Sequence, residues 1–180
     1  VAAEWGSSVP RTVERILREN GNATVMNLEL YDAENTRLLA RQPWMMTCTD
    51  GRTPAEGQAV THPRVYGAFP QKMRMYALDS YDISVAFAVR SMSGLAADFL
   101  RLEDRGRLAP GSWADIAVID LLTYRSSATY TDPHRYADGV RHLLVNGTFA
   151  IRDGEFIDAR AGMALRNGGT PVSPAASATP

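Results

Sequence analysis

Two short stretches hold the residues that could do chemistry: PWMMTCTDG at residues 43–51 and THPRVYG at residues 61–67. In the first stretch an apolar run ends at Asp50, and a glycine follows directly. The second stretch offers an imidazole, a guanidinium and a phenol on His62, Arg64 and Tyr66. The planar fork of an arginine fits a carboxylate. These residue types could together form a site that combines a catalytic acid with recognition of an anion.

Each of these residues also has an ordinary interpretation. An aspartate before a glycine is typical of a turn, a histidine before a proline of a loop, and an arginine of the surface. We interpret Cys48 as a small buried thiol and not as a nucleophile. We interpret His134 and His142 as structural. Three scattered histidines predict no complete metal site within this chain.

An apolar strand over residues 44–49 is predicted to position the acid. Side chains alternate along a strand, so Met46, Cys48 and Asp50 would share one face. In a parallel barrel that face would point inward. Asp50 would then lie at the C-terminal end of the strand, where barrel enzymes hold their catalytic groups.

The front of the chain predicts alternating helices and strands. Helical patterns cover residues 7–20 and 32–42, the second with Asp32 as its N-cap, and a buried strand is predicted over residues 23–30. This alternation favours a parallel α/β sheet. The loop from Gly51 to Pro63 is long for a compact domain, and loops of this length are usually part of a functional site. Three more helices are expected, from Pro70 to Asp79, over 82–93 with Gly94 as the stop, and over 95–102.

The back of the chain is predicted to be antiparallel β structure. A β run covers residues 114–120, and two further runs flank Asn146-Gly147, a strong hairpin signal. Asp153-Gly154 offers a second turn. We place the boundary between an α/β region, 1–104, and a β region, 105–166, and expect residues 167–180 to be a disordered tail.

Composition excludes several classes of protein. The chain has 180 residues, a net charge of -1 and one cysteine. The near-neutral charge gives no indication of nucleic-acid binding, and one cysteine allows no internal disulfide. No apolar run is long enough to span a membrane. The first ten residues do not have the features of a signal peptide. They also lack an initiator methionine, which predicts that the chain begins inside a longer protein. Localisation is open between the cytoplasm and the bacterial periplasm.

Four segments occur in an order that resembles a known family: WMMTCTDG, HPRVYGAFP, DRGRLAPGSWADIAVID and VRHLLVNGTFAIRDGE. Together they resemble the C-terminal part of the amidohydrolase superfamily, and more narrowly the N-acyl-D-amino-acid deacylases (D-aminoacylases), over most of residues 10–166. The resemblance implies the last strands and helices of a metal-dependent (β/α)8 TIM barrel, followed by part of a small β-sandwich. Residues 23–30 and 44–49 would be barrel strands 7 and 8.

The resemblance also implies roles for individual residues. Asp50 matches the acid at the end of strand 8, which takes a proton from the metal-bound water and returns one to the leaving amine. Arg64 matches the arginine that clamps the α-carboxylate of an N-acyl amino acid, with His62 and Tyr66 in supporting, substrate-binding roles. Zinc is the implied cofactor, with ligands mainly from an N-terminal remainder of the enzyme. Such a partial barrel is expected to need that remainder as its partner for activity, and a homo-oligomer is compatible with its open edges.

Departures from the family pattern keep other functions open. Thr49 stands where serine is usual, and Gln71 where arginine is usual, so the acyl group, the side chain and strict D specificity are not fixed. A dihydropyrimidinase-like, prolidase-like or dipeptidase-like amidohydrolase is the alternative enzyme. A non-catalytic partner module is the alternative of another class.

Overall fold

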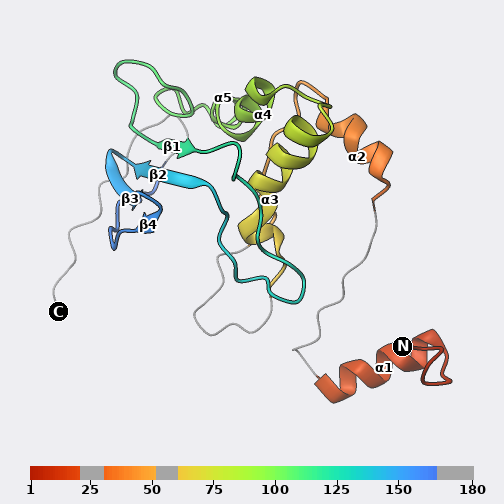
Figure 1. The fold of residues 1–180 in the computed structure, drawn as a ribbon. Coiled ribbons are helices and arrows are strands. Elements are labelled where there is room, and N and C mark those ends of the chain that lie inside the picture. The colour runs from red at the N-terminus through yellow and green to blue at the C-terminus, as the bar shows by residue number, and fades with distance from the viewer. Residues whose placement is uncertain (21–30, 52–60, 166–180) are drawn as a thin grey trace.

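The computed structural model describes residues 1–20, 31–51 and 61–165. Its helical elements are α1 (Val9–Asn20), α2 (Ala33–Ala40), α3 (Arg64–Lys72), the π-helix η2 (Met73–Asp79), α4 (Val85–Met92) and α5 (Gly94–Phe99). Its strands are β1 (Ile116–Ile119), β2 (Val140–Val145), β3 (Thr148–Arg152) and β4 (Glu155–Phe156). Figure 1 shows the helices in the first part of the chain and the strands in the second. None of the described helices is long and apolar enough to cross a membrane.

The four strands form one antiparallel sheet in the order β1-β2-β3-β4. Both predicted hairpin turns are confirmed. Asn146 and Gly147 join β2 to β3 with φ of 51° and 81°, and Asp153 and Gly154 join β3 to β4 with φ of 52° and 86°. Asparagine, aspartate and glycine tolerate this left-handed region best, which is why these dipeptides predict the turns.

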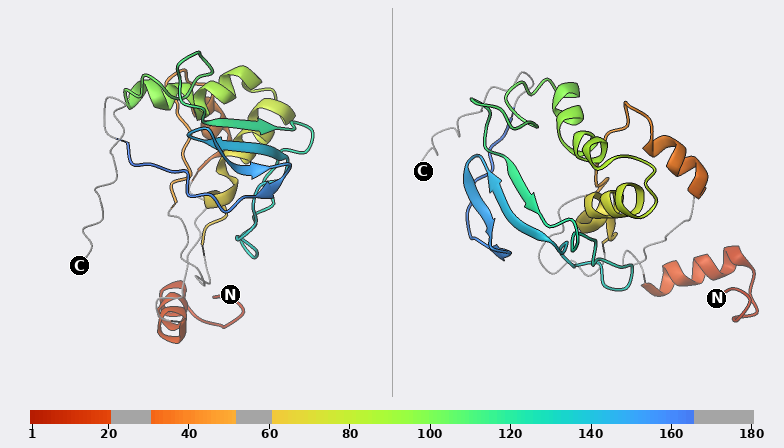
Figure 2. Two further views of the ribbon diagram at one scale, coloured as in Figure 1. Left: turned by 90° about the vertical axis from the view of Figure 1, so that its left-hand side faces the viewer. Right: turned by 45° about the horizontal axis from the view of Figure 1, so that its top comes forward.

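The core lies between the helices and the start of the sheet. Met73 and Ala77 from η2, with Ala88 from α4, are almost completely buried, and they pack with Ile83 and Tyr124. Ile119 and Val140, from β1 and β2, cover the cluster from the side of the sheet. Figure 2 shows α3, η2 and α4 facing the sheet across this region, while α1 lies apart.

The predicted helices form, but two of their boundaries differ. α2 begins after Asp32, whose carboxylate accepts the N–H groups of Glu34 and Asn35, as expected of an N-cap. The helix expected to start at Pro70 instead starts at Arg64, because Pro63 already has helical dihedrals at the N-cap position. Gly94 does not end the helical region but begins α5, after a break at Ser93, where φ is −138° and ψ is −84°.

The strand predicted over residues 44–49 is not formed. Residue 44 lies in a turn and residues 45–49 have no regular secondary structure. Among the described residues they have no strand partner, and a β ladder needs one. Their backbone is tied to a helix instead, since the Thr47 N–H donates to the Ser91 carbonyl at 2.9 Å. All strand pairs in the described part of the chain are antiparallel. The predicted strand 23–30, most of the long loop and the predicted tail lie outside the described residues.

Candidate active site

Asp50 and Arg64 form the centre of the candidate site. The Arg64 Nη2 lies 2.8 Å from Asp50 Oδ2, and the Arg64 Nε–H donates to the Asp50 backbone carbonyl at 2.9 Å. Asp50 has a positive φ of 44°, and its carboxylate reaches Arg64 at the start of α3. Gly51 fits this turn because a Cβ there would lie 2.5 Å from a methyl carbon of Val65. The two predicted functional residues are therefore neighbours.

His62 supports the first turn of α3. Its Nδ1 accepts the backbone N–H of Arg64 at 3.1 Å, and its ring meets the ring of Tyr130 edge-on at 5.2 Å. Partial burial, and then the nearby Arg64 guanidinium, lower the pKa of His62 below its usual 6.5, with the Asp50 carboxylate opposing them. The neutral imidazole that can accept this hydrogen bond is therefore the favoured form at neutral pH.

Tyr66 is directed towards the β1–β2 connection. Its hydroxyl lies 3.2 Å from His134 Nδ1, and its ring meets the rings of His134 and Tyr136 edge-on. The structure thus gives His134 a partner on α3 that sequence reasoning did not find, because the two residues are 68 positions apart. His142 accepts the N–H of Asp153 and lies beside Phe149 in the sheet.

A cleft of about 380 Å³ opens beside Arg64. Its side formed by α3 and the residues before it includes His62, Arg64, Gly67 and Gln71. Its other side comes from residues 126–130, which were not predicted to contribute to a site. Of these, Tyr130 is the only aromatic, and no spacing in the sequence connects it with Arg64.

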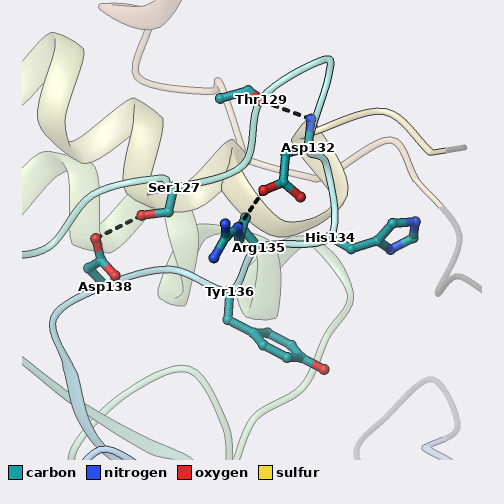
Figure 3. A pocket seen from close by; sticks show the side chains of 7 residues that line it. All are labelled: Ser127, Thr129, Asp132, His134, Arg135, Tyr136 and Asp138. Atoms are coloured by element: carbon teal, nitrogen blue, oxygen red, sulfur yellow. Dashed lines mark hydrogen bonds and ion pairs between the residues drawn. The ribbon is translucent and has the colours of Figure 1, made fainter.

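Residues 125–138, named here the 125–138 loop, connect β1 and β2 and enclose a second hollow of about 550 Å³ (Figure 3). The charged side chains of this hollow are paired within the loop. Asp132 accepts from Arg135 at 2.6 Å, and Asp138 accepts from Ser127 at 2.7 Å. Because these charges pair with groups of the same loop, they stabilise the loop and do not converge on the hollow to bind a ligand.

A third, apolar hollow of about 390 Å³ lies between α2, residues 45–48 and α3. Cys48 lines it and is exposed, so the interpretation as a buried thiol was wrong. The expected cover was a completed barrel, and the described residues do not provide it. Lys72 lies at the same hollow with its Nζ 2.8 Å from Thr47 Oγ1, and desolvation lowers the pKa of Lys72.

The described residues contain no metal site of their own. Nowhere in residues 1–20, 31–51 and 61–165 do three or more histidine, cysteine or acidic side chains gather in a way that could hold a metal ion. Asp50 faces an arginine, and the histidine beside it is engaged with the backbone. The residues present therefore do not fit a complete metal centre.

Comparison with known proteins identifies the family. The sequence model of the amidohydrolase family matches residues 8–151. The chain is 31% identical over 147 residues to an N-acyl-D-glutamate deacylase of Alcaligenes xylosoxydans xylosoxydans, which covers 82% of this chain and 28% of that protein. It is 33% identical over 165 residues to a D-aminoacylase of the same organism, covering 92% and 32%.

Solved structures agree with the sequence relatives. A D-aminoacylase crystal structure aligns with a TM-score of 0.71 and 28% identity, over 89% of this chain and 32% of that one. The N-acyl-D-glutamate deacylase of Bordetella bronchiseptica, solved with zinc and a phosphonate mimic of the tetrahedral intermediate, aligns with a TM-score of 0.67 and 26% identity, over 88% and 33%. This chain belongs to the amidohydrolase family, and within it the similarity is to the D-aminoacylases. It spans about a third of the length of these relatives.

Proposed function

We propose that this chain is part of a hydrolase that cleaves the amide bond of N-acyl-D-amino acids, releasing a D-amino acid and a carboxylate. The adjacency of Asp50 and Arg64 carries the proposal, because it puts a proton acceptor beside a carboxylate-binding fork. The similarity to deacylases named for D-glutamate and D-aspartate supports this substrate class.

The two residues would divide the work. Arg64 would bind the α-carboxylate of the substrate through two parallel hydrogen bonds, which fixes the amino-acid end and lets the configuration at the α-carbon decide where the side chain points. Asp50 would accept a proton from the attacking water and return it to the leaving amine. His62 and Tyr66, two residues before and two after Arg64, would complete the substrate-binding turn.

The complete enzyme would contain more than the described residues. We assign the ligands of a catalytic zinc ion to residues outside them, since the described part of the chain holds no such group. A bound zinc ion would supply Lewis-acid polarisation of the scissile carbonyl. In this proposal residues 1–104 belong to a (β/α)8 barrel and residues 105–166 to a β-sandwich, and the remaining barrel is the obligatory partner.

The native mass of the purified protein, together with the intact mass of every polypeptide in it, gives the first test. We expect a second polypeptide or a longer chain to accompany this sequence. That material should release amino acid from N-acetyl-D-glutamate, N-acetyl-D-aspartate or N-acetyl-D-leucine, and not from their L enantiomers. Material that contains a complete barrel and hydrolyses none of the D substrates would overturn the proposal.

A further inference from the structure

The 125–138 loop is closed at its base. Arg125 and Asp138 face each other as an isolated antiparallel bridge, and the Arg125 Nε lies 3.1 Å from Asp138 Oδ2. Just beyond, a Cβ on Gly139 would lie 2.5 Å from the Tyr124 nitrogen, so only glycine fits this approach. Figure 3 shows hydrogen bonds inside the loop, from Ser127 to Asp138 and from Arg135 to Asp132. A loop with joined ends and internal hydrogen bonds is expected to hold its shape as a unit.

This loop contacts residues on both sides of Arg64, one in the segment before α3 and one within α3. Two residues before it, the ring of His62 meets the ring of Tyr130 at an interplanar angle of 82°. Two residues after it, the Tyr66 ring lies 5.8 Å from that of His134 and their polar atoms are within hydrogen-bond distance. Edge-to-face ring pairs have a preferred geometry, so they orient the groups they join.

A third contact fixes how closely the loop approaches the helix. A Cβ on Gly67 would lie 2.1 Å from Ser126 Oγ and 2.9 Å from Ser126 Cβ. Real Cβ atoms do not come so close, so the absence of a side chain at residue 67 allows the approach. Gly67 directly follows Tyr66 in α3, so this contact lies beside the second ring pair.

We propose that Tyr130 and His134 are positioning residues for Arg64: the loop holds the first turn of α3 through its ring contacts. Tyr130 orients the His62 ring, whose Nδ1 in turn accepts the Arg64 backbone N–H. His134 contacts the same turn through Tyr66. The role in substrate binding rests on the proposed function of Arg64, but the positioning contacts themselves do not.

Amide hydrogen exchange of the purified protein tests the contacts without any activity. The amides of Val65, Tyr66 and Gly67 bond to the carbonyls of His62 and Pro63 and report opening of this turn. In Tyr130→Ala we expect them to exchange about three- to tenfold faster, as expected for loss of one ring pair. Tyr130→Phe keeps the ring and should exchange like the wild type.

Two further variants complete the exchange test. Tyr81→Ala, at another exposed tyrosine beyond the far end of η2, controls for loss of a surface ring. Tyr66→Phe removes the hydroxyl next to His134 Nδ1 and should also speed exchange. Unchanged exchange at residues 65–67 in both Tyr130→Ala and Tyr66→Phe would overturn the proposal, whether or not the protein is a deacylase.

Kinetics then test the consequence for the site. In the complete enzyme, Tyr130→Ala should raise KM for an N-acyl-D-amino acid several-fold and change kcat less, because it disturbs the carboxylate-binding turn and not the acid. Tyr130→Phe should restore the wild-type KM. A KM unchanged in Tyr130→Ala, in an active enzyme, would overturn the positioning role. A wild-type enzyme without deacylase activity would overturn the proposed function alone, and the exchange result would still decide on the contacts.

Discussion

Arg64 holds Asp50 at two points, through an ion pair of 2.8 Å to the carboxylate and a hydrogen bond of 2.9 Å to the backbone carbonyl. The carboxylate is 77% exposed and the guanidinium side chain 44% exposed. Exposed ion pairs contribute little to stability because water competes for both charges. In the proposed function, the α-carboxylate of a substrate would therefore displace Asp50 from the guanidinium at little cost and leave Asp50 free to accept a proton.

Replacing Asp50 should strongly reduce turnover and leave the fold intact. Asp50→Asn keeps the size of the side chain and the tolerance for a positive φ, but it removes the proton acceptor. We expect kcat of the complete enzyme to fall by about 10²–10⁴, the usual contribution of a general acid–base group, with an unchanged melting temperature. Steady-state assay and thermal unfolding measure both quantities.

Asp153→Asn is the matched control, because Asp153 is also exposed, has a φ of 52° and precedes a glycine. It should retain full activity. If Asp50→Asn were as active as Asp153→Asn, Asp50 would be a turn residue only, and the non-catalytic module would be the better description of this chain.

Replacing Arg64 should weaken substrate binding. Arg64→Ala removes the fork for the α-carboxylate, so kcat/KM should fall about 10²-fold, as expected for loss of a charge-assisted hydrogen-bonded pair of roughly 3 kcal/mol. Arg64→Lys should recover only part, because an ammonium group lacks the planar fork. Kinetic assays of both variants on one N-acetyl-D-amino acid give this comparison.

Arg74→Ala controls for loss of an exposed arginine on the same helical segment, since Arg74 pairs with Asp79 on the surface. It should change kcat/KM little. An amidohydrolase that acts on cyclic amides would not need Arg64 to bind a carboxylate. If Arg64→Ala turned over a substrate without an α-carboxylate as fast as the wild type, that alternative would be favoured.

Short-range signals predicted much of the described fold. The Asp32 cap and the two hairpin turns were predictable because each depends on the backbone chemistry of two to four consecutive residues. The prediction of a strand before Asp50 was wrong because a strand depends on residues far away in the sequence. A strand needs a partner, and the partner predicted for it lies outside the described residues.

The candidate site divides in the same way. Asp50, His62 and Arg64 lie within 15 positions, so their proximity was predictable from one strand-to-loop connection. Tyr130 and His134 reach the site from more than 60 positions away, through the packing of a loop against a helix. Neither composition nor periodicity carries such long-range information. Gly67, which permits the approach, precedes the helix predicted from Pro70, and nothing in the sequence marks it as a contact residue.

The close approach of Gly67 to Ser126 can be tested by a double-mutant cycle. Gly67→Ala should destabilise the protein by about 1–3 kcal/mol, the usual cost of overpacking, although alanine favours helix more than glycine does. Ser126→Gly removes the atoms that the new Cβ would meet, so the double variant should recover most of the loss. Urea unfolding of the four proteins gives the coupling energy, and additive effects would contradict the contact.

Replacing Arg105 should cause a large loss of stability. Its side chain is 7% exposed, forms an ion pair with Asp115 and donates from Nη2 to Asn146 Oδ1 at 2.7 Å. It thereby ties the segment after α5 to the start of β1 and to the β2–β3 turn. Arg105→Ala should cost about 2–4 kcal/mol, somewhat less than for a fully buried pair because Asp115 is partly exposed.

Arg107→Ala is the control for Arg105, since Arg107 pairs with Asp98 at the surface. It should change the free energy of unfolding by less than about 0.5 kcal/mol. Equal urea midpoints for the two variants would show that Arg105 does not join the helical region to the sheet.

Lys72 is expected to make the free energy of unfolding depend on pH in the alkaline range. It is the only lysine of the sequence, it is buried, and desolvation alone accounts for its lowered pKa, with no carboxylate pairing to it in the described part of the chain. Between its folded-state pKa and the ordinary value near 10.5, the unfolded chain binds more protons than the folded one. The contribution of this group therefore makes the protein more stable as pH rises through that window.

Lys72→Met tests this dependence by removing the charge while filling a similar volume. At pH 7 the variant should be more stable than the wild type by about 1 kcal/mol, because a desolvated charge without an opposite charge is replaced by an apolar group. The difference between the two proteins should shrink as pH approaches 10.5, and titration of the tyrosines largely cancels in that difference. Urea unfolding of both proteins at pH 7, 9 and 10.5 measures it. A difference that stays constant across this range would mean that Lys72 has the same pKa in the folded and unfolded chain, and that its burial against Thr47 carries no electrostatic cost.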